Sequence, residues 1–401
     1  MILDCPCLQL RGWLDTSEMR DDRQARFRFT TPGRPKWLLL AATTLSLVPC
    51  NARADAGTPL MWAGIAHLVV GNLFIGLFEG ILLAKVFSLG RGKSVLLMIA
   101  ANYFSAWFGD FFLTSHIARS IHMDLNNGWC WFWTLVVGTY LMTLVLEWPF
   151  VAFCFRPSAG WFKRSLKGNF LVQTASYLLL FGWYWMASGT GLYTQMHVVP
   201  PGDISMPPSV LLYFIGEQDG NVYIRNFSGS INRKVFDLQS TDGDDRLLVR
   251  QSAKNTNDWD IVARVATQDF RNPKFITIQS NFIGQAVLDA RSSLQPPQYE
   301  GTWFNFGKIS KLGAAAGSDW NFRSGFWAIE GFSGENQAKH AGLHFSLETP
   351  FAQWVVRNAT HLPSDKVVLQ LGENQICILD PDSKRIALLT HGRGPVAVIP
   401  K

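Results

Sequence analysis

Four apolar segments constrain the fold of this chain most strongly, because they repeat one pattern twice. The two copies read GNLFIGLFEGILLAKVF (residues 71–87) and GTYLMTLVLEWPFVAFCF (residues 138–155). Each copy carries one glutamate, Glu79 or Glu147, at the same distance from its final phenylalanine. Carboxyl groups inside a membrane are costly and rarely incidental, and transport folds are often built from repeats of this kind.

The similarity continues into the segment that follows each copy. A basic connector comes first, and then Ala101-Asn102-Tyr103 matches Ala175-Ser176-Tyr177. The apolar segments lie at residues 61–87, 94–112, 131–155 and 169–186. Each is near the ~20 residues that a helix needs to cross a bilayer. The sequence therefore predicts a four-helix transmembrane bundle made of two repeated helical hairpins.

The composition indicates two unlike halves. The chain has 401 residues, of which 48% are hydrophobic and 16% charged, too apolar for an ordinary soluble protein and too mixed for a pure membrane bundle. We divide it into a leader (1–56), a transmembrane domain (57–190), a Pro-rich linker (191–209) and an all-β domain (210–401). The net charge of +6 comes largely from the N-terminal stretch and the connectors, so nucleic acid is not a predicted partner.

The leader contains a segment with the pattern of a signal peptide. Residues 34–57 read RPKWLLLAATTLSLVPCNARADAG, with a basic flank, a short apolar run and small residues in A-x-A spacing. The apolar run is too short to span a bilayer comfortably, which favours a cleaved signal over a retained anchor. Both alternatives leave residue 57 outside the cytoplasm.

The charges of the connectors predict the orientation. Residues 88–93 and 156–168 are rich in Arg and Lys, whereas the loop 114–129 is not. Basic connectors remain in the cytoplasm, so this loop and everything after Met186 are predicted to be extracytoplasmic. The expected location is the cytoplasmic (inner) membrane, with several passes and a periplasmic or otherwise extracytoplasmic C-terminal domain.

From about Val198 the pattern changes to short β-type runs between turn clusters. The predicted strands are residues 210–217, 221–227, 233–238, 246–251, 258–265, 274–279, 326–330, 342–347, 366–371, 375–379, 385–389 and 396–399. Residues 215–238 and 371–389 resemble one another, each with the order strand, tight turn, strand, polar turn, strand. Such units are typical of propeller blades, so we predict a β-propeller-like domain, with a β-sandwich of the same strands as the alternative.

Five polar residues fall inside the predicted helices: Glu79, Glu147, Asn72, Asn102 and Gln173. A carboxyl group in a low-dielectric environment is favoured in its neutral form, as a proton carrier requires. The simpler interpretation is that both glutamates form hydrogen bonds with neighbouring helices, the amides being their partners. We favour this structural role and keep proton transfer as the alternative.

A second polar group, Asp110, His116, His122 and Asp124, lies near the predicted outer face. Histidines and carboxylates can hold a metal or act as acid and base, but the spacing matches no ligand motif, and a solvated loop is the favoured interpretation. The sequence contains no Gly-x-Ser-x-Gly, Walker, dinucleotide-binding or His-Glu-x-x-His motif. We therefore predict no catalytic residue, metal or cofactor.

Three hypotheses for function follow. The first is a binding or assembly protein whose β domain recognises an envelope protein, peptide or glycan outside the membrane. The second is a proton-coupled transporter or channel component that uses Glu79 and Glu147. The third is a membrane-bound enzyme that uses the outer-face Asp/His group. The lipid bilayer is a partner in all three, a homo-oligomer stays open, and the missing catalytic motifs favour the first.

Overall fold

The computed structural model describes residues 58–109, 111, 121–156, 158–205, 209–227, 229, 231–252, 258–267, 273–285, 309–312, 317–325 and 331–400. All of these residues belong to one structural unit, Gly57–Lys401. The predicted leader and the strand predicted at residues 326–330 lie outside the described residues.

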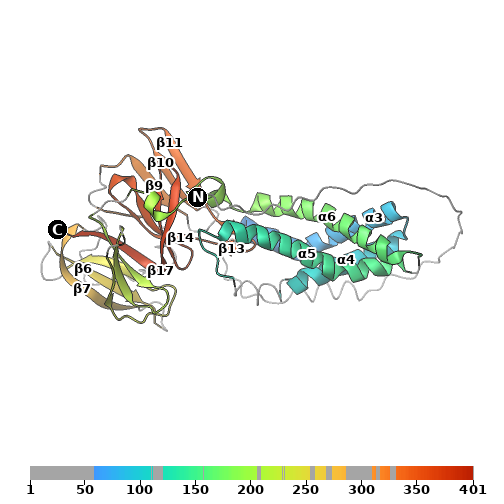
Figure 1. The fold of residues 1–401 in the computed structure, drawn as a ribbon, viewed down its shortest axis with the longest axis horizontal. Helices are drawn as coiled ribbons and strands as arrows, with labels where there is room; N and C mark the ends of the chain where they lie inside the picture. Colours follow the sequence, from blue (N-terminus) through green and yellow to red (C-terminus); the bar gives the residue numbers. More distant parts are fainter. Residues whose placement is uncertain are drawn as a thin grey trace. The chain divides into compact units, whose positions relative to one another are not determined.

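Four long helical stretches form the first part of the described chain (Figure 1). The first, Pro59–Phe87, is continuous and joins α2 (Pro59–Ala66), the π-helical turn η1 (His67–Gly71) and α3 (Asn72–Phe87). The others are α4 (Arg91–Phe108), α5 (Gly128–Phe155) and α6 (Trp161–Ala187). Each predicted apolar segment falls largely within one of these stretches. Two of them, Pro59–Phe87 and Gly128–Phe155, are long and apolar enough to cross a membrane.

Local capping sets the ends of the first helix. The side-chain oxygen of Thr58 accepts a hydrogen bond from the backbone nitrogen of Met61 at 3.1 Å, and Pro59 occupies the first turn. Both features favour a helix start. The helix stops after Phe87 because Ser88 takes the left-handed conformation, with φ of 54°, a common way for helices to end.

The four helical stretches pack as a closed ring, α3 against α4, α4 against α5, α5 against α6 and α6 against α3. Gly76 and Gly80 permit the closest of these contacts. A β-carbon on Gly76 would lie 2.5 Å from Ile99 Cα, and one on Gly80 would lie 2.4 Å from Val95 Cα. Carbon atoms pack at about 3.5–4.0 Å, so only glycine fits. Small residues four apart are typical of helix pairs in membranes.

The helices bury one set of apolar side chains and expose another. Buried between them is a cluster formed by Leu83, Met98, Ala101, Val151, Cys154, Phe155 and Val172. Large apolar side chains on the outer surface of each helix are exposed, among them Phe74 (63%), Leu96 (66%), Val145 (72%) and Leu178 (69%). The outer surface of the bundle is therefore as apolar as this buried cluster.

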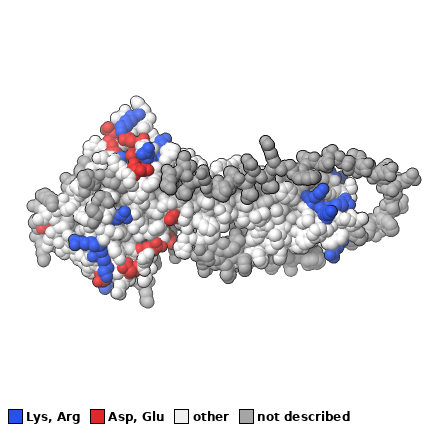
Figure 2. Space-filling view, in the orientation of Figure 1, with Lys and Arg blue, Asp and Glu red and all other residues white. Residues whose placement is uncertain are grey.

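The two basic connectors lie at the same end of the bundle. Lys93 Nζ donates a hydrogen bond to the backbone oxygen of Phe153 at 2.7 Å, which ties the start of α4 to the end of α5. Arg164 Nη2 donates to the backbone oxygen of Phe87 at 3.2 Å, which ties the start of α6 to the end of α3. Figure 2 shows Lys and Arg side chains gathered at this end of the bundle.

The C-terminal part is built around one large, curled, mixed sheet, like half of a barrel (Figure 1). It contains twelve strands. They are β1 (His197–Val198), β2 (Leu211–Gly216), β3 (Val222–Asn226), β4 (Asn232–Phe236), β5 (Arg246–Gln251), β6 (Asp258–Val265), β7 (Lys274–Gln285), β8 (Ser310–Lys311), β14 (Val356–His361), β15 (Val367–Leu371), β16 (Gln375–Asp380) and β17 (Arg385–Pro400). β1 and β8 pair in parallel with β17 and β14, respectively, and the other pairs are antiparallel.

Strand β17 connects the two parts of this sheet. Its first part pairs with β16, and its second part pairs with β2 and β7. The register with β2 shifts between Arg393 and Val396, and Gly394 lies within that bulge with φ of 57°. A β-carbon on Gly394 would lie 2.4 Å from Arg246 Cα, so the strand can bend here only with glycine. The two strands predicted in this region form one strand.

Two smaller sheets complete the described part of the domain. β9 (Trp320–Ser324), β10 (Phe332–Asn336) and β11 (Ala341–Phe345) form a three-stranded antiparallel sheet, and β12 (Glu348–Thr349) pairs with β13 (Ala352–Gln353). Aromatic side chains of the three-stranded sheet share a core with one face of β14–β17. This core includes Trp320, Phe322, Phe332 and Phe345 on one side and Val356, Leu369, Cys377 and Ile386 on the other.

The described strands do not form the predicted propeller. Blades of a propeller are separate four-stranded sheets, whereas β17 joins twelve strands into one hydrogen-bonded sheet. The alternative, a β-sandwich, requires two sheets packed face to face. Only the sheet β9–β11 packs in this way among the described strands, and the large sheet curls around two further buried clusters.

The stretch predicted as a linker, residues 191–209, contains α7 (Gly191–Thr194), β1 and the 3-10 turn η4 (Pro201–Asp203). Leu192 and Met196 are buried in the aromatic core described above. Since β1 also pairs with β17, this stretch packs as part of the C-terminal domain.

Candidate functional site

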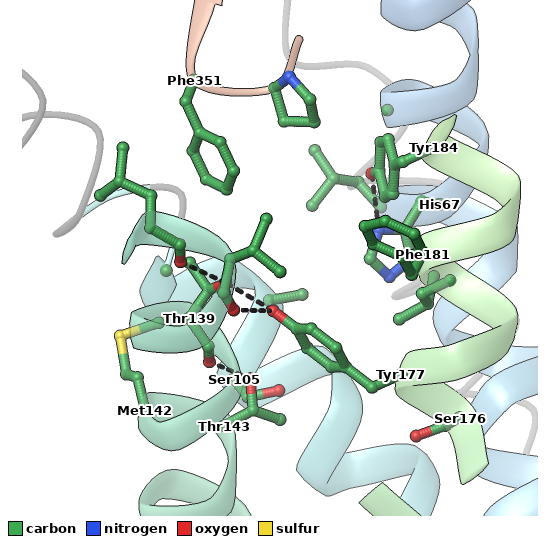
Figure 3. Close-up of a pocket in the computed structure, with 18 of the residues that line it drawn as sticks. His67, Ser105, Thr139, Met142, Thr143, Ser176, Tyr177, Phe181, Tyr184 and Phe351 are labelled. Carbon is green, nitrogen blue, oxygen red and sulfur yellow. Dashed lines mark hydrogen bonds between the residues drawn. The ribbon is translucent and has the colours of Figure 1, made fainter. Parts of the chain in front are cut away.

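A cavity of about 520 Å³ lies between the four helices (Figure 3). Most of its wall is apolar. The wall residues include Leu68, Leu135, Val136, Met142, Leu180 and Phe181. The volume is within the ~300–1,000 Å³ of small-molecule sites, which are also mainly apolar with a few convergent polar groups.

The β domain contributes to the mouth of the cavity. Pro350 and Phe351, in the turn between β12 and β13, line it together with residues of the helices, such as Phe132 and Trp185. The ring of Phe351 packs edge to face on Phe132 of α5, with 6.1 Å between the ring centroids. Figure 3 shows Phe351 on one side of the cavity, away from Ser105 and Ser176. The mouth therefore depends on both parts of the chain.

Hydrogen bonds at the mouth hold the two parts together. The backbone nitrogen and oxygen of Gly189 pair with those of Glu348 at 2.8–2.9 Å, and the backbone nitrogen of Leu125 donates to Gln375 Oε1 at 2.6 Å. Tyr193 Oη donates to the backbone oxygen of Leu125 at 3.1 Å. Burial, with a contribution from nearby carboxylate charge, raises the pKa of Tyr193, so this phenol stays a donor.

Opposite the mouth, a polar layer crosses all four helices. Asn102 Nδ2 of α4 donates to Glu79 Oε2 of α3 at 2.5 Å. One helical turn further along α4, Ser105 Oγ donates to Glu147 Oε1 of α5 at 2.5 Å. Gln173 Nε2 of α6 donates to Glu147 Oε2, also at 2.5 Å. We refer to these five residues as the polar layer.

The two carboxyl groups of the polar layer are almost fully buried, with exposed fractions of 0% for Glu79 and 1% for Glu147. They lie close enough to interact electrostatically. Their hydrogen bonds offset part of the cost of removing them from water. Glu79 Oε1 has no hydrogen-bond partner among the described residues. This arrangement can bind a proton, and it can accept hydrogen bonds from a ligand.

The structure thus brings together four of the five polar residues singled out in the sequence, as the pairs Asn102–Glu79 and Gln173–Glu147. The fifth, Asn72, is buried and lines the same cavity, but its amide donates to Leu68 of its own helix at 3.4 Å.

Several residues of the site were not anticipated from the sequence. Ser105 belongs to the polar layer, Thr139 and Tyr177 form a short hydroxyl pair on the wall, and His67 Nδ1 is hydrogen-bonded with Tyr184 Oη at 2.8 Å. Spacing offers a signal for the first of these. Ser105 follows Asn102 by three positions, which places both on one helix face.

The predicted outer-face group is only partly described, because Asp110 and His116 lie outside the described residues. Asp124 Oδ1 accepts from the backbone nitrogens of Asn126 and Asn127 at 2.9 and 3.1 Å, just before α5. His122 contributes its backbone oxygen to the Asn127 side chain at 3.2 Å. Within the described ranges no three His, Cys, Asp or Glu side chains are placed to share a metal ion.

Comparison of the chain with protein-family models, with curated proteins and with solved structures gives no match. The geometry of the site is therefore the basis for a functional assignment.

Proposed function

We propose that this chain is a multi-pass protein of the cytoplasmic membrane that binds an amphipathic small molecule inside its four-helix bundle, with its β domain on the extracytoplasmic side. The observation that carries the proposal is the cavity, which has apolar walls and ends on the polar layer. An amphipathic ligand fits such a site because its chain meets apolar walls and its polar end meets hydrogen-bonding groups.

The outer surface of the bundle supports a membrane location. Each helix exposes large apolar side chains, for example Phe74, Leu96, Val145 and Leu178. In water such a continuous apolar surface would associate non-specifically, whereas lipid chains would cover it. Pro59–Phe87 and Gly128–Phe155 meet the length and composition of spans by themselves. We place α4 and α6 in the membrane as well, because they complete the ring around the cavity.

Contacts between the hairpins support their origin as a repeat. Phe87 and Phe155, which end the two matching segments, pack edge to face with 5.2 Å between ring centroids. Tyr103 and Tyr177, which also correspond in sequence, donate to the backbone oxygens of Val69 and Val136 at 2.6 and 3.3 Å. Corresponding residues thus make corresponding contacts.

The orientation is testable by cysteine labelling in intact spheroplasts, in a background with Cys130 replaced by serine. We expect a cysteine at exposed Lys339 of the β domain to react with a membrane-impermeant maleimide. A cysteine at exposed Gly92, in the basic end of the bundle, should react only after permeabilisation, because basic ends stay in the cytoplasm. The reverse pattern of labelling would contradict the proposed topology.

Ligand binding is testable by filling the cavity. The substitution Thr143→Phe places a ring where a small side chain now lines the cavity. We expect it to reduce labelling of the bundle interior by a photoreactive long-chain alcohol, a diazirine probe, by roughly tenfold or more. The measurement is peptide mapping by mass spectrometry after irradiation of the full chain in detergent.

A matched control is Leu141→Phe, since Leu141 is on the same helix and is 54% exposed, outside the cavity. It should leave labelling of the interior unchanged. If Thr143→Phe is monodisperse and still labels inside the bundle as strongly as the unchanged chain, the cavity is not the binding site.

A further inference from the structure

Three hydroxyl groups on the cavity wall, those of Thr139, Thr143 and Ser176, have already donated their protons. Thr139 Oγ1 donates to Leu135 O at 2.9 Å, and Thr143 Oγ1 donates to Thr139 O at 2.9 Å. Ser176 Oγ donates to Gln173 O at 3.2 Å. A hydroxyl has one proton and two lone pairs, so each of these groups can offer a ligand only an acceptor.

The polar layer also offers a ligand hydrogen-bond acceptors. Asn102 Nδ2 donates both to Glu79 and to the backbone oxygen of Met98, the latter at 3.0 Å, which uses both of its N–H groups. The two oxygens of Glu147 each accept one hydrogen bond, and a carboxylate oxygen can accept another. The end of the cavity is therefore rich in acceptors.

The ionisable side chains around the cavity also disfavour an anionic ligand. None of the described lining residues is Lys or Arg. The ionisable groups that line it are Glu147 at the polar layer and, on the wall, the imidazole of His67 and the phenols of Tyr177 and Tyr184. Glu79 lies behind Asn102. An anionic head group would lose its water here without gaining a cationic partner, which is costly in an apolar site.

We propose that the ligand is a neutral amphiphile whose polar end carries a hydroxyl group, as in a long-chain or isoprenoid alcohol, and that this hydroxyl donates a hydrogen bond to Glu147. This inference rests on the proposed function, since it assigns the ligand class of the same cavity. The hydroxyl lies at the polar layer, and the chain extends along the apolar wall toward Phe351. Lipids with an anionic head group, including the anionic phospholipids, are rejected.

The experiment compares two diazirine probes with identical alkyl chains, one ending in a primary alcohol and one in a sulfonate, which stays anionic at every working pH. Both are applied to the full chain in detergent, and cross-linked peptides are mapped. We expect the alcohol to label peptides that line the cavity and the sulfonate to label them at least roughly tenfold less. Unlabelled long-chain alcohol should compete for these positions.

Each outcome separates the two proposals. Equal or stronger cavity labelling by the sulfonate overturns the ligand class and leaves the proposed function standing. If neither probe labels the cavity, the proposed function fails, and the ligand class fails with it. The comparison needs only the unchanged chain, so a variant that does not fold cannot obscure it.

The variant Glu147→Gln tests the assigned acceptor. It keeps the size of the side chain and replaces one acceptor oxygen with an amide N–H donor, so it should narrow the preference for alcohol over sulfonate several-fold. Val145→Ala is the control, because Val145 lies on the same helix with 72% of its surface exposed. If Glu147→Gln leaves the preference as large as Val145→Ala does, Glu147 is not the group that receives the hydroxyl.

Discussion

Replacing Gly80 with leucine is expected to stop α3 and α4 from packing and to destabilise the helical bundle by about 3 kcal/mol or more. The reason is that any β-carbon at this position would lie 2.4 Å from Val95 Cα and 2.8 Å from its backbone nitrogen. A flexible side chain could move aside, but helix backbone cannot. The measurement is thermal unfolding of the purified chain in detergent, followed by the helical circular dichroism signal.

The control for this prediction is Gly138→Leu on α5. A β-carbon on Gly138 meets no atom within 4 Å, so leucine is accommodated, and it favours helix more than glycine does. The midpoint of unfolding should stay equal or rise slightly. If both variants unfold at the same temperature, the close contact at Gly80 does not stabilise the bundle.

Truncation of Phe345, in the β domain, is expected to have the second large effect on stability. Its ring is fully buried and lies 5.4 Å from that of Phe332, in the core shared by the sheet β9–β11 and the large sheet. Phe345→Ala should lower the free energy of unfolding of the β domain by about 3–5 kcal/mol. Hydrogen exchange of peptides from β9 to β11, measured in the full chain, reports the change.

Ile283→Ala provides the comparison, since Ile283 of β7 is 56% exposed. It should alter the free energy of unfolding by no more than about 0.5 kcal/mol. Equal protection of the β9–β11 peptides in Phe345→Ala and in Ile283→Ala would show that this core does not hold the small sheet in place.

The two predictions differ in physical origin. In a bilayer, burial of apolar surface between helices gives little driving force, because lipid chains are equally apolar, so close packing matters most. In the β domain, which we place in water, the loss of buried apolar area itself is costly. The same chain therefore depends on two different contributions to stability.

The helices were the most predictable part of the fold. Long apolar runs of Leu, Phe and Val identify a helix without any tertiary information, and each of the four segments lies largely within a described helix. The glutamate–amide pairs were also foreseen as hydrogen-bond partners, since a buried carboxyl needs a donor and few polar residues share the bundle. The cavity was not foreseen. Side chains of all four helical stretches line it, among them the small residues Ser105 and Ser176, and the local sequence pattern does not show how separate helices will pack.

In the β domain, local pattern identified strands but not their arrangement. β10 (sequence FSGEN) and β14 (sequence VRNATH) lack a clear apolar alternation. Neither strand was therefore predicted from the sequence. Gly392-Arg393-Gly394-Pro395 has the composition of a turn, and it divided β17 into two predicted strands. In the structure these residues form a bulge within β17 instead. The separate blades of the predicted propeller are not present among the described strands, because a continuous β17 joins twelve of them into one sheet.

The central place of β17 also has a consequence for biogenesis. β1, β2 and β7 all pair with β17, which is synthesised long after they are. While the ribosome is still translating, these strands have unsatisfied edges, and such non-local pairings form slowly. We therefore expect the domain to assemble only after residues 385–400 have been synthesised.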